Sequence, residues 1–418
     1  MKFDDYHIAE GIKKSISKLG YKKPTDIQYK SIPPILRGED VLAIAQTGTG
    51  KTAAFAIPIL DMIQERNNTQ RRPDGVKCLV MAPTHELALQ IESVFHKLGK
   101  HARVTTFCIH GGVEQAPQIK QLDKGVDILI ATPGRMFDLV SQGVLNLKRV
   151  ELLVLDEADH MLDLGFIKDI QDLMRHIPRK RQTLFFSATI NPTIKKLAYS
   201  LVSNAIRIQI SPKDPVAKNI EHAVAFVEMD DKRFFLENLI QNNEEKKILV
   251  FVRTKVRAER VKKAMERVKI ETGTLHSDKT HEERNETMHL FRKGALKILI
   301  ATDISARGID IQGIEYVVNY DLPESLENYV HRVGRTGRGN EKGQAISFCS
   351  TEEKEILKEI ETQLEKPIRR VELSKGDYQE ILLDTTEEKK ENINTLLKEI
   401  EETEQWKKKK KGKAKNRK

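Results

Sequence analysis

Short apolar runs alternate with segments of helical periodicity along most of the chain. In the first half, segments such as residues 87–98 and 165–176 carry the helical pattern. Apolar runs that show no polar face are typical of strands in a parallel sheet covered by helices on both sides. The pattern therefore predicts an α/β fold. The predicted strands of this half are residues 41–44, 78–81, 127–130, 152–155 and 183–186.

The pattern stops at residues 211–215, where two prolines fall within five residues, and then starts again. This break predicts a linker between two α/β domains. In the second half, residues 355–364 form a predicted helix, and the predicted strands are residues 247–252, 297–301, 316–319 and 345–349. The predicted organisation is a domain at 1–210, a linker at 211–217, a domain at 218–365, an acidic and partly helical extension at 366–405, and a Lys-rich tail at 406–418.

Charge distinguishes the tail from the body. The formal net charge is +10, yet residues 406–418 hold nine Lys or Arg and no acid, which leaves 62 basic and 61 acidic residues elsewhere. A terminal block of like charge is typical of a disordered segment that binds polyanions, or of a solubilising tail. Cys78, Cys108 and Cys349 lie in apolar runs without metal-ligand spacing, which indicates a reducing compartment. With no signal peptide and no membrane-length apolar run, we expect a soluble cytoplasmic protein.

The first candidate for chemistry is a glycine-rich loop between the strand at 41–44 and a helical segment that begins near residue 53. Glycines let backbone N–H groups approach phosphate oxygens, Lys51 adds a charge for the β and γ phosphates, and the Thr52 hydroxyl can bind Mg²⁺. Ala45 stands where the strict pattern has its first glycine, and a negative φ would tolerate it. The predicted phosphate-binding residues are Gln46, Thr47, Gly48, Thr49, Gly50, Lys51 and Thr52.

A second candidate follows the strand at 152–155, where the chain places Asp156, Glu157 and Asp159. Carboxylates at a buried strand end are costly without partners, so Mg²⁺ and a water are expected there. We assign Asp156 to the metal and Glu157 to the attacking water as general base. Asp159 is expected to bridge to the hydroxyls of Ser187 and Thr189, which could equally be simple strand-end caps. Together, the two candidates predict a nucleoside triphosphatase.

Residues 331–339 place Arg332, Arg335 and Arg338 at three-residue spacing among glycines. Guanidinium groups neutralise the charge on a transferring phosphoryl group, so Arg335 and Arg338 are candidates for catalysis from the second domain. A salt-bridged turn or an RNA-contacting loop would show the same spacing. We assign the neighbouring His331 and Arg332 to coupling between the two ligand sites.

With these motifs in this order, the sequence resembles the DEAD-box RNA helicases from Phe3 to about residue 350. The segment with Phe3, Tyr21 and Gln28 resembles the family's adenine-sensing segment, in which the glutamine amide suits the edge of adenine and the tyrosine packs against the base. The resemblance implies two tandem RecA-like domains, ATP and Mg²⁺ as cofactors, and Asp310 near the ATP ribose. Segments at 83–88, 111–112, 132–135, 252–254 and 301–303 resemble RNA-contact motifs. The RNA-binding residues implied are Pro83, Thr84, Gly112, Thr132, Arg135, Arg253, Thr254, Arg284 and Thr302.

Two residues depart from the family pattern: His85 replaces an arginine of the first RNA-contact motif, and His281 stands where glutamine is common. Both put the corresponding RNA contacts in doubt. The body with its tail is most similar to the bacterial RhlE-like branch. The resemblance implies a monomer that acts on RNA, with ribosome-assembly or RNA-degradation proteins as candidate partners and no membrane.

Three functions compete at this point. The first is RNA-stimulated ATP hydrolysis that drives local, largely sequence-independent unwinding of RNA. The second is a DNA helicase of related architecture, which the Gln28 segment and the Asp-Glu-Ala-Asp sequence of residues 156–159 disfavour. The third is a non-catalytic RNA clamp, against which the intact Lys51 and Glu157 argue.

Overall fold

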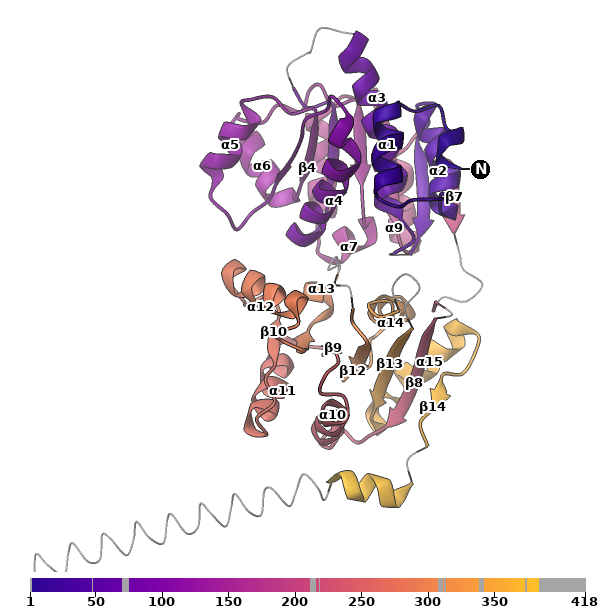
Figure 1. Cartoon of the computed structure of the whole chain (residues 1–418), viewed down its shortest axis with the longest axis vertical. Helices are drawn as coiled ribbons and strands as arrows, with labels where there is room; N and C mark the ends of the chain where they lie inside the picture. Colours follow the sequence, from indigo (N-terminus) through magenta and orange to yellow (C-terminus); the bar gives the residue numbers. More distant parts are fainter. Residues whose placement is uncertain are drawn as a thin grey trace, which may run out of the picture.

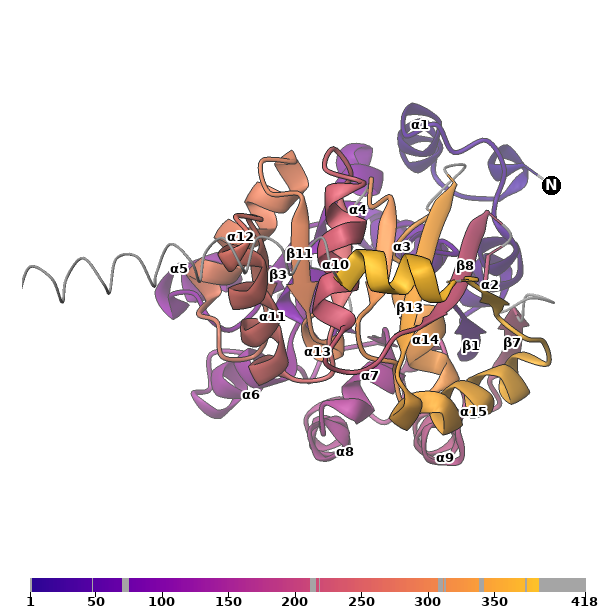
Figure 2. The same ribbon diagram turned by 90° about the horizontal axis from the view of Figure 1, so that it is seen from below.

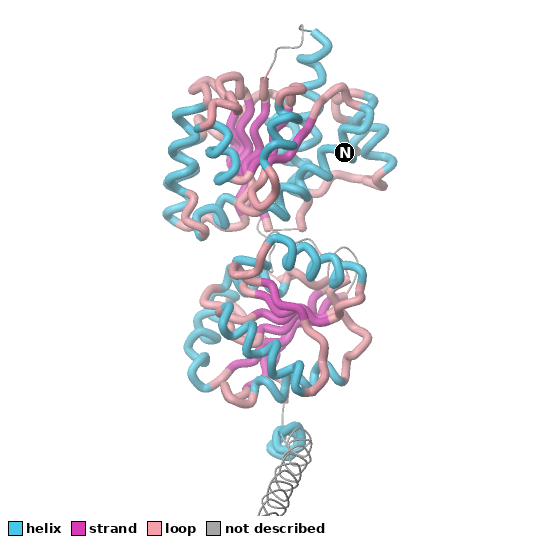
Figure 3. The backbone as a smooth tube through the Cα atoms, turned by 90° about the vertical axis from the view of Figure 1, so that its left-hand side faces the viewer, coloured by secondary structure: helices cyan, strands magenta, loops and turns pink. Residues whose placement is uncertain are grey.

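The computed structural model of the chain describes residues 2–46, 48–69, 75–210, 216–217, 219–306, 311, 313–337, 342–372 and 374–382. Two α/β domains follow one another, and in each the strands lie inside a cover of helices (Figures 1 and 3). Residues 211–215 of the predicted linker at 211–217, the extension from residue 383 and the Lys-rich tail lie outside the described residues. None of the helices in the described part of the chain combines the length and apolar character needed to cross a bilayer.

Domain one contains a seven-stranded parallel sheet in the order β3-β4-β2-β5-β6-β1-β7. Its strands are β1 (Val41–Ala45), β2 (Cys78–Met81), β3 (Thr106–Ile109), β4 (Ile128–Ala131), β5 (Leu152–Leu155), β6 (Gln182–Ser187) and β7 (Ile206–Ile210). Its helices are α1 (Glu10–Lys18), α2 (Asp26–Leu36), α3 (Lys51–Thr69), α4 (His85–Leu98), α5 (Gln115–Leu122), α6 (Pro133–Ser141), α7 (Ala158–Asp163), α8 (Ile167–His176) and α9 (Pro192–Leu201).

Domain two repeats the architecture with the order β10-β11-β9-β12-β13-β8-β14. Its strands are β8 (Ile220–Phe226), β9 (Ile248–Phe251), β10 (Gly273–Leu275), β11 (Ile298–Ala301), β12 (Tyr316–Asn319), β13 (Gly343–Cys349) and β14 (Arg369–Arg370). Its helices are α10 (Lys232–Gln241), α11 (Lys255–Arg267), α12 (His281–Lys293), α13 (Asp303–Ala306), α14 (Leu326–Val333) and α15 (Lys354–Leu364). Short 3-10 turns η1 (Phe3–Asp5), η2 (Gly99–His101) and η3 (Thr351–Glu353) complete the elements.

The strands are apolar on both faces because each sheet separates two cores. In β1, Val41 and Ala43 belong to one cluster of buried side chains, whereas Leu42 and Ile44 belong to the other. Successive side chains of a strand point to opposite faces, so both faces of a covered sheet must be apolar. The predicted α/β fold with helix-covered parallel sheets is confirmed.

The second sheet extends beyond residue 365, the predicted end of domain two. Strand β14 pairs with β8, with Arg369 opposite Ala223. Residues 375–382 then form a helix whose Tyr378 and Ile381 pack against the core of domain two. The boundary was placed too early because a two-residue strand carries no periodicity.

Candidate active site

The junction of β5 and α7 positions the carboxylates at the edge of domain one that faces domain two (Figure 1). Glu157 is the N-cap of α7 with φ 50° and ψ 51°, a left-handed conformation that a non-glycine residue adopts at a cost of about 1–3 kcal/mol. The Glu157 N–H donates to Asp156 Oδ1 at 3.0 Å. Both side chains are buried, which places two negative charges in the interior.

The carboxyls of Asp156 and Glu157 have different pKa values, although both are buried. Desolvation raises the pKa of Asp156 to about 6, despite the opposing charge of Lys51. Burial also acts to raise the pKa of Glu157, but His160, Lys51 and Arg335 outweigh it and hold this pKa at about 2. His160 Nδ1 lies 3.5 Å from Glu157 Oε2, one helical turn away. Glu157 is therefore ionised at neutral pH.

The phosphate loop joins β1 to α3. Ala45 is the last residue of β1 and is not among the residues with positive φ, so alanine is tolerated there as predicted. Gly48 and Gly50 have φ values of 82° and 92°, which side chains rarely adopt. Lys51 is only 6% exposed, and its Nζ donates to no acceptor among the described residues. Such a buried, unsatisfied ammonium fits an anionic ligand. Thr47 lies outside the described residues.

The predicted adenine-sensing segment contacts the phosphate loop directly. Gln28 Nε2 donates to the Gly50 carbonyl at 3.2 Å, and Thr25 Oγ1 donates to the Thr49 carbonyl at 2.8 Å. The other end of the Gln28 amide, Oε1, accepts from the Thr25 N–H at 3.0 Å. A Cβ at Gly50 would meet Gln28 Nε2 at 2.5 Å, so only glycine permits this approach. Both ends of the Gln28 amide are thus engaged by the protein, which the sequence did not predict. Tyr21 is 38% exposed beside Phe3.

The residues predicted to hold Mg²⁺ fit that ion. Thr52 lies in the first turn of α3, and Asp156 is a buried carboxyl directly after β5 whose pKa is raised by burial. Among the described residues, no group of three His, Cys, Asp or Glu side chains could hold a metal ion alone. Mg²⁺ typically keeps several waters and binds through one or two protein oxygens together with substrate phosphates.

Asp159 links α7 to the end of β6, but not as the sequence suggested. Its Oδ2 accepts from the Thr189 hydroxyl at 3.2 Å and from the Thr189 and Ala188 N–H groups, each at 3.0 Å. The expected bond to Ser187 is wrong, because Ser187 Oγ is buried without a hydrogen-bond partner among the described residues. Backbone donors take the place of that hydroxyl.

Domain two contributes Arg335. This side chain is buried, its Nε donates to the His331 carbonyl at 3.2 Å, and its charge helps lower the pKa of Glu157 across the domain gap. His331 is partly buried at the end of α14. Arg338 and Asp310, which the sequence assigned to the same site, lie outside the described residues.

Arg332 makes its contacts within domain two. Its Nε and Nη2 donate to the two oxygens of Asp303 at 2.5 and 2.7 Å, and its Nη1 donates to the Asp321 carbonyl at 2.7 Å. The guanidinium also lies 5.2 Å from the centre of the Phe251 ring. Arg332 therefore fastens α14 to α13, the helix that follows β11.

Most of the predicted RNA-contact residues directly follow strands of the two sheets. Pro83 and Thr84 follow β2, Thr132 follows β4, and Thr302 follows β11. Gly112 has a φ of 73°, and Thr254 caps α11. Arg135 Nη2 donates to the Val113 carbonyl, and Arg253 Nη2 lies 3.5 Å from Glu353. The His85 ring lies 5.2 Å from the His110 ring. The side chain of His281 lies outside the described residues.

Arg284 joins the two domains. Its Nη2 donates to Glu86 Oε1 at 2.6 Å, and each side chain is only 16% exposed. Burial would raise the pKa of Glu86, but the Arg284 charge and hydrogen bond lower it. The sequence assigned Arg284 to RNA and placed Glu86 within the RNA-contact segment 83–88, but it did not predict that the two side chains pair. It also missed His160, although its position three residues after Glu157 at a helix start was a usable signal.

Comparison with known proteins identifies the family of the chain. A DEAD/DEAH box helicase model matches residues 25–197, and a helicase conserved C-terminal domain model matches residues 231–340. The DEAD-box ATP-dependent RNA helicase RhpA of Helicobacter pylori is 38% identical over 367 residues, which cover 87% of this chain and 73% of that protein. The chain belongs to the DEAD-box helicase family.

A second relative in the family, the ATP-dependent RNA helicase CshA of Listeria monocytogenes, is 38% identical over 87% of this chain and 69% of its own length. Among solved structures, S. cerevisiae Dbp5 bound to RNA and ADP BeF3 has a TM-score of 0.79 at 29% identity, covering 91% of this chain and 99% of that one. A DEAD box protein from Methanococcus jannaschii has a TM-score of 0.51 at 35% identity, covering 89% and 99%. The expected pair of RecA-like domains is thereby confirmed, whereas the RhlE-like branch stays a prediction.

Proposed function

We propose that this DEAD-box protein is an ATP-dependent RNA helicase in which RNA stimulates ATP hydrolysis and hydrolysis drives local unwinding or remodelling. One observation carries the proposal. The buried group of Lys51, Asp156 and Glu157 lies in domain one, and Arg335 of domain two adds its charge to those of His160 and Lys51, which lower the pKa of Glu157. The site is complete only when the two domains are together.

Each side chain then has a role. Lys51 would bind the β and γ phosphates, and Thr52 and Asp156 would hold Mg²⁺, which supplies positive charge at the phosphates when bound. Glu157 would orient and polarise the attacking water. Because its pKa is about 2, Glu157 is a weak base, so orientation matters more than proton removal. Arg335 would neutralise charge on the transferring phosphoryl group.

RNA would act by favouring the closed arrangement. The predicted RNA-contact residues come from both domains, so RNA that touches both stabilises their contact, and ATP does the same. The Glu86–Arg284 ion pair adds a direct link. We further propose a cytoplasmic monomer whose tail at 406–418 adds salt-sensitive RNA affinity.

The decisive experiment compares ATP turnover and duplex unwinding with RNA and with DNA loading strands of the same sequence. We expect turnover to rise with single-stranded RNA and unwinding to require an RNA loading strand. Equal unwinding from DNA loading strands would favour the DNA helicase. Turnover that RNA does not raise would favour the non-catalytic clamp.

A further inference from the structure

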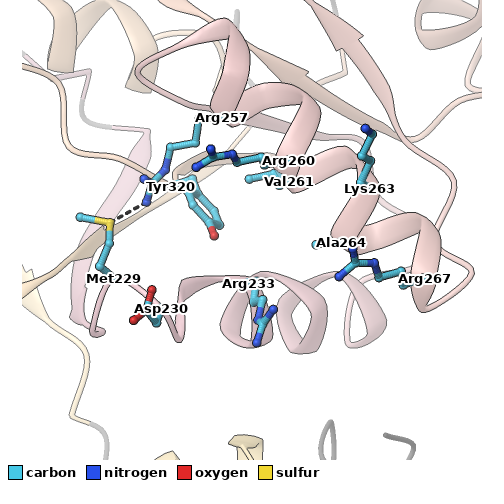
Figure 4. Close-up of a pocket in the computed structure, with 10 residues that line it drawn as sticks. All are labelled: Met229, Asp230, Arg233, Arg257, Arg260, Val261, Lys263, Ala264, Arg267 and Tyr320. Carbon is cyan, nitrogen blue, oxygen red and sulfur yellow. Dashed lines mark hydrogen bonds between the residues drawn. The ribbon is translucent and has the colours of Figure 1, made fainter. Parts of the chain in front are cut away.

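A basic cavity lies between α10 and α11 of domain two, and these helices lie away from domain one (Figures 1 and 2). Its volume is about 570 Å³. Figure 4 shows side chains of both helices around the space, with Tyr320 and the segment before α10. The lining residues are Met229, Asp230, Arg233, Arg257, Arg260, Val261, Lys263, Ala264, Arg267 and Tyr320. Five of these are cationic and one is acidic, so the cavity favours an anionic ligand.

Most of this positive charge is not neutralised by neighbouring side chains. Arg257 Nε lies 3.0 Å from Asp321, which balances that cation. By contrast, Arg260, Lys263 and Arg267 are exposed and form no ion pair with any described residue. Arg233 Nε is buried and donates to no described acceptor. A guanidinium N–H that is buried without an acceptor is costly, so a ligand that supplies one is expected.

The remaining lining determines which anion fits. Val261, Ala264, Met229 and the ring of Tyr320 give the cavity an apolar part among the arginines. A single-stranded RNA site would present exposed aromatic rings for base stacking, whereas Tyr320 is only 5% exposed. A peptide with acidic and apolar side chains matches both the arginines and the apolar surface.

This chain carries such a peptide close to the cavity. The Tyr378 hydroxyl of helix 375–382 donates to Asp231 at 2.7 Å, and its ring lies 4.8 Å from that of Phe235. Asp231 adjoins Asp230, which lines the cavity. Between Asp384 and Glu404 the sequence has eight acidic and three basic residues, with Ile393, Leu396, Leu397 and Ile400 at helical spacing. Five extended residues after Leu382, the last described residue, span roughly 17 Å, so Asp384 and Glu387 lie within that reach of helix 375–382.

We propose that the cavity between α10 and α11 binds this chain's own acidic segment, residues 384–404. Carboxylates of the segment would pair with Arg233, Arg260 and Arg267, and its apolar side chains would cover Val261 and Ala264. Such docking would hold the adjoining Lys-rich tail on domain two.

The test uses the full-length chain and its single tryptophan, Trp406, which directly follows the segment. A cysteine introduced at the exposed α10 residue Gln241 can be labelled with a fluorescent acceptor, because Cys78, Cys108 and Cys349 are buried. We expect energy transfer from Trp406 to this acceptor at low salt. R260E/R267E should lose most of it, while the matched domain-one variant R179E/K180E should keep it.

A charge swap makes the test specific. E387R/E388R alone should also lose transfer, and combining it with R260E/R267E should restore transfer. Unchanged transfer in R260E/R267E, or no restoration in the combined variant, would overturn the proposal. It would equally be overturned if R260E/R267E left transfer intact but weakened binding of a single-stranded RNA more than R179E/K180E does, because the cavity would then be an RNA contact.

Discussion

The two domains have the same sheet architecture, but two of their buried cations, Arg332 of domain two and Lys51 of domain one, differ in their partners. In domain two, Arg332 is buried and all three of its nitrogens donate to acceptors. In domain one, Lys51 is buried with no acceptor for its Nζ among the described residues, and the pKa of Asp156 is raised. Satisfied buried ions are typical of structural networks, whereas unsatisfied ones indicate a site prepared for a ligand.

Lys232 of domain two supports this contrast. It is fully buried, but its Nζ lies 2.5 Å from Glu353, which also accepts from the Leu322 and Ser350 N–H groups. The comparison teaches that burial alone does not identify an active site, since both domains bury lysines and carboxylates. The missing partner does, so substitutions of buried ions with all their partners should lower stability, whereas substitutions in the candidate active site should lower activity.

The largest effect is expected for R335A, because Arg335 is the charge that domain two adds to the site of domain one. Turnover of ATP with saturating RNA should fall about 10³- to 10⁵-fold, with little change in the free energy of unfolding. Steady-state ATPase assays and urea melts measure the two quantities. R179A, an exposed domain-one arginine, is the control. A loss of less than tenfold would remove Arg335 from the reaction.

E157Q should follow, since it keeps the size of the side chain but removes the carboxylate that faces the water. We expect about a 10²- to 10⁴-fold loss of turnover with nearly normal affinity for ATP and RNA. Equilibrium binding of a fluorescent ATP analogue and of labelled RNA separates binding from reaction. Normal turnover in E157Q would show that another group handles the water.

R332Q tests the structural side of the comparison. Arg332 is buried, whereas the side chain of Asp303 is 26% exposed, so removing the guanidinium should destabilise domain two by about 1–3 kcal/mol, because the buried oxygens of Asn319 and Asp321 lose their donor. Urea unfolding, with R335A as the matched variant three residues away, measures the difference. Equal stability of R332Q and R335A would contradict the division between structural and active-site arginines.

D156N should stabilise the protein without nucleotide while abolishing ATP turnover. The pKa of Asp156 is about 6 when folded against an ordinary value of 3.8, so its ionisation costs stability as the pH rises from about 4 through 6. D156N should therefore be more stable by about 2–3 kcal/mol at pH 7, and the gain should vanish near pH 4. Urea melts at both pH values check this. A destabilised D156N at pH 7 would show that the carboxylate is satisfied.

The smallest effect concerns the link between the domains. E86Q should weaken RNA binding in the presence of a non-hydrolysable ATP analogue by about fivefold, or ~1 kcal/mol, because the closed arrangement loses its ion pair with Arg284. The double variant E86Q/R284M should bind no worse than R284M alone. E245Q, in an exposed pair with Lys297, is the control. Additive losses in the double variant would mean that the two side chains act separately.

The sequence predicted the sheets well, because a strand buried on both faces leaves an unbroken apolar run. Residues 78–81 and 152–155 coincide with β2 and β5. Strands β3, β7, β8, β10 and β14 were not predicted, and of these β10 and β14 have only three and two residues, which show no period. Gly50, Lys51 and Asp156 were predicted as site residues because backbone turns and catalytic chemistry restrict which residue types can serve.

Partners across the fold could not be predicted in the same way. Glu86 and Arg284 are 198 residues apart, and no local pattern shows that they meet. The adenine contact of Gln28 stays a prediction, and the hydrogen bonds of its amide to Thr25 and Gly50 were not predicted. A local pattern indicates which residues belong to a site, whereas the contact partner of each residue depends on how distant strands and helices pack.

The position of β1 in its sheet has a consequence for synthesis of the chain. Although β1 is the first strand, its neighbours are β6 and β7, and Val41 lies opposite Leu184 and Ile206. At about 5–20 residues per second, a ribosome needs roughly 7–30 seconds to make the intervening stretch. During this interval β1 exposes both hydrogen-bonding edges and an apolar surface, which are features that promote aggregation. Chaperone demand should therefore be highest while residues 46–181 emerge, and it should fall once β6 is complete.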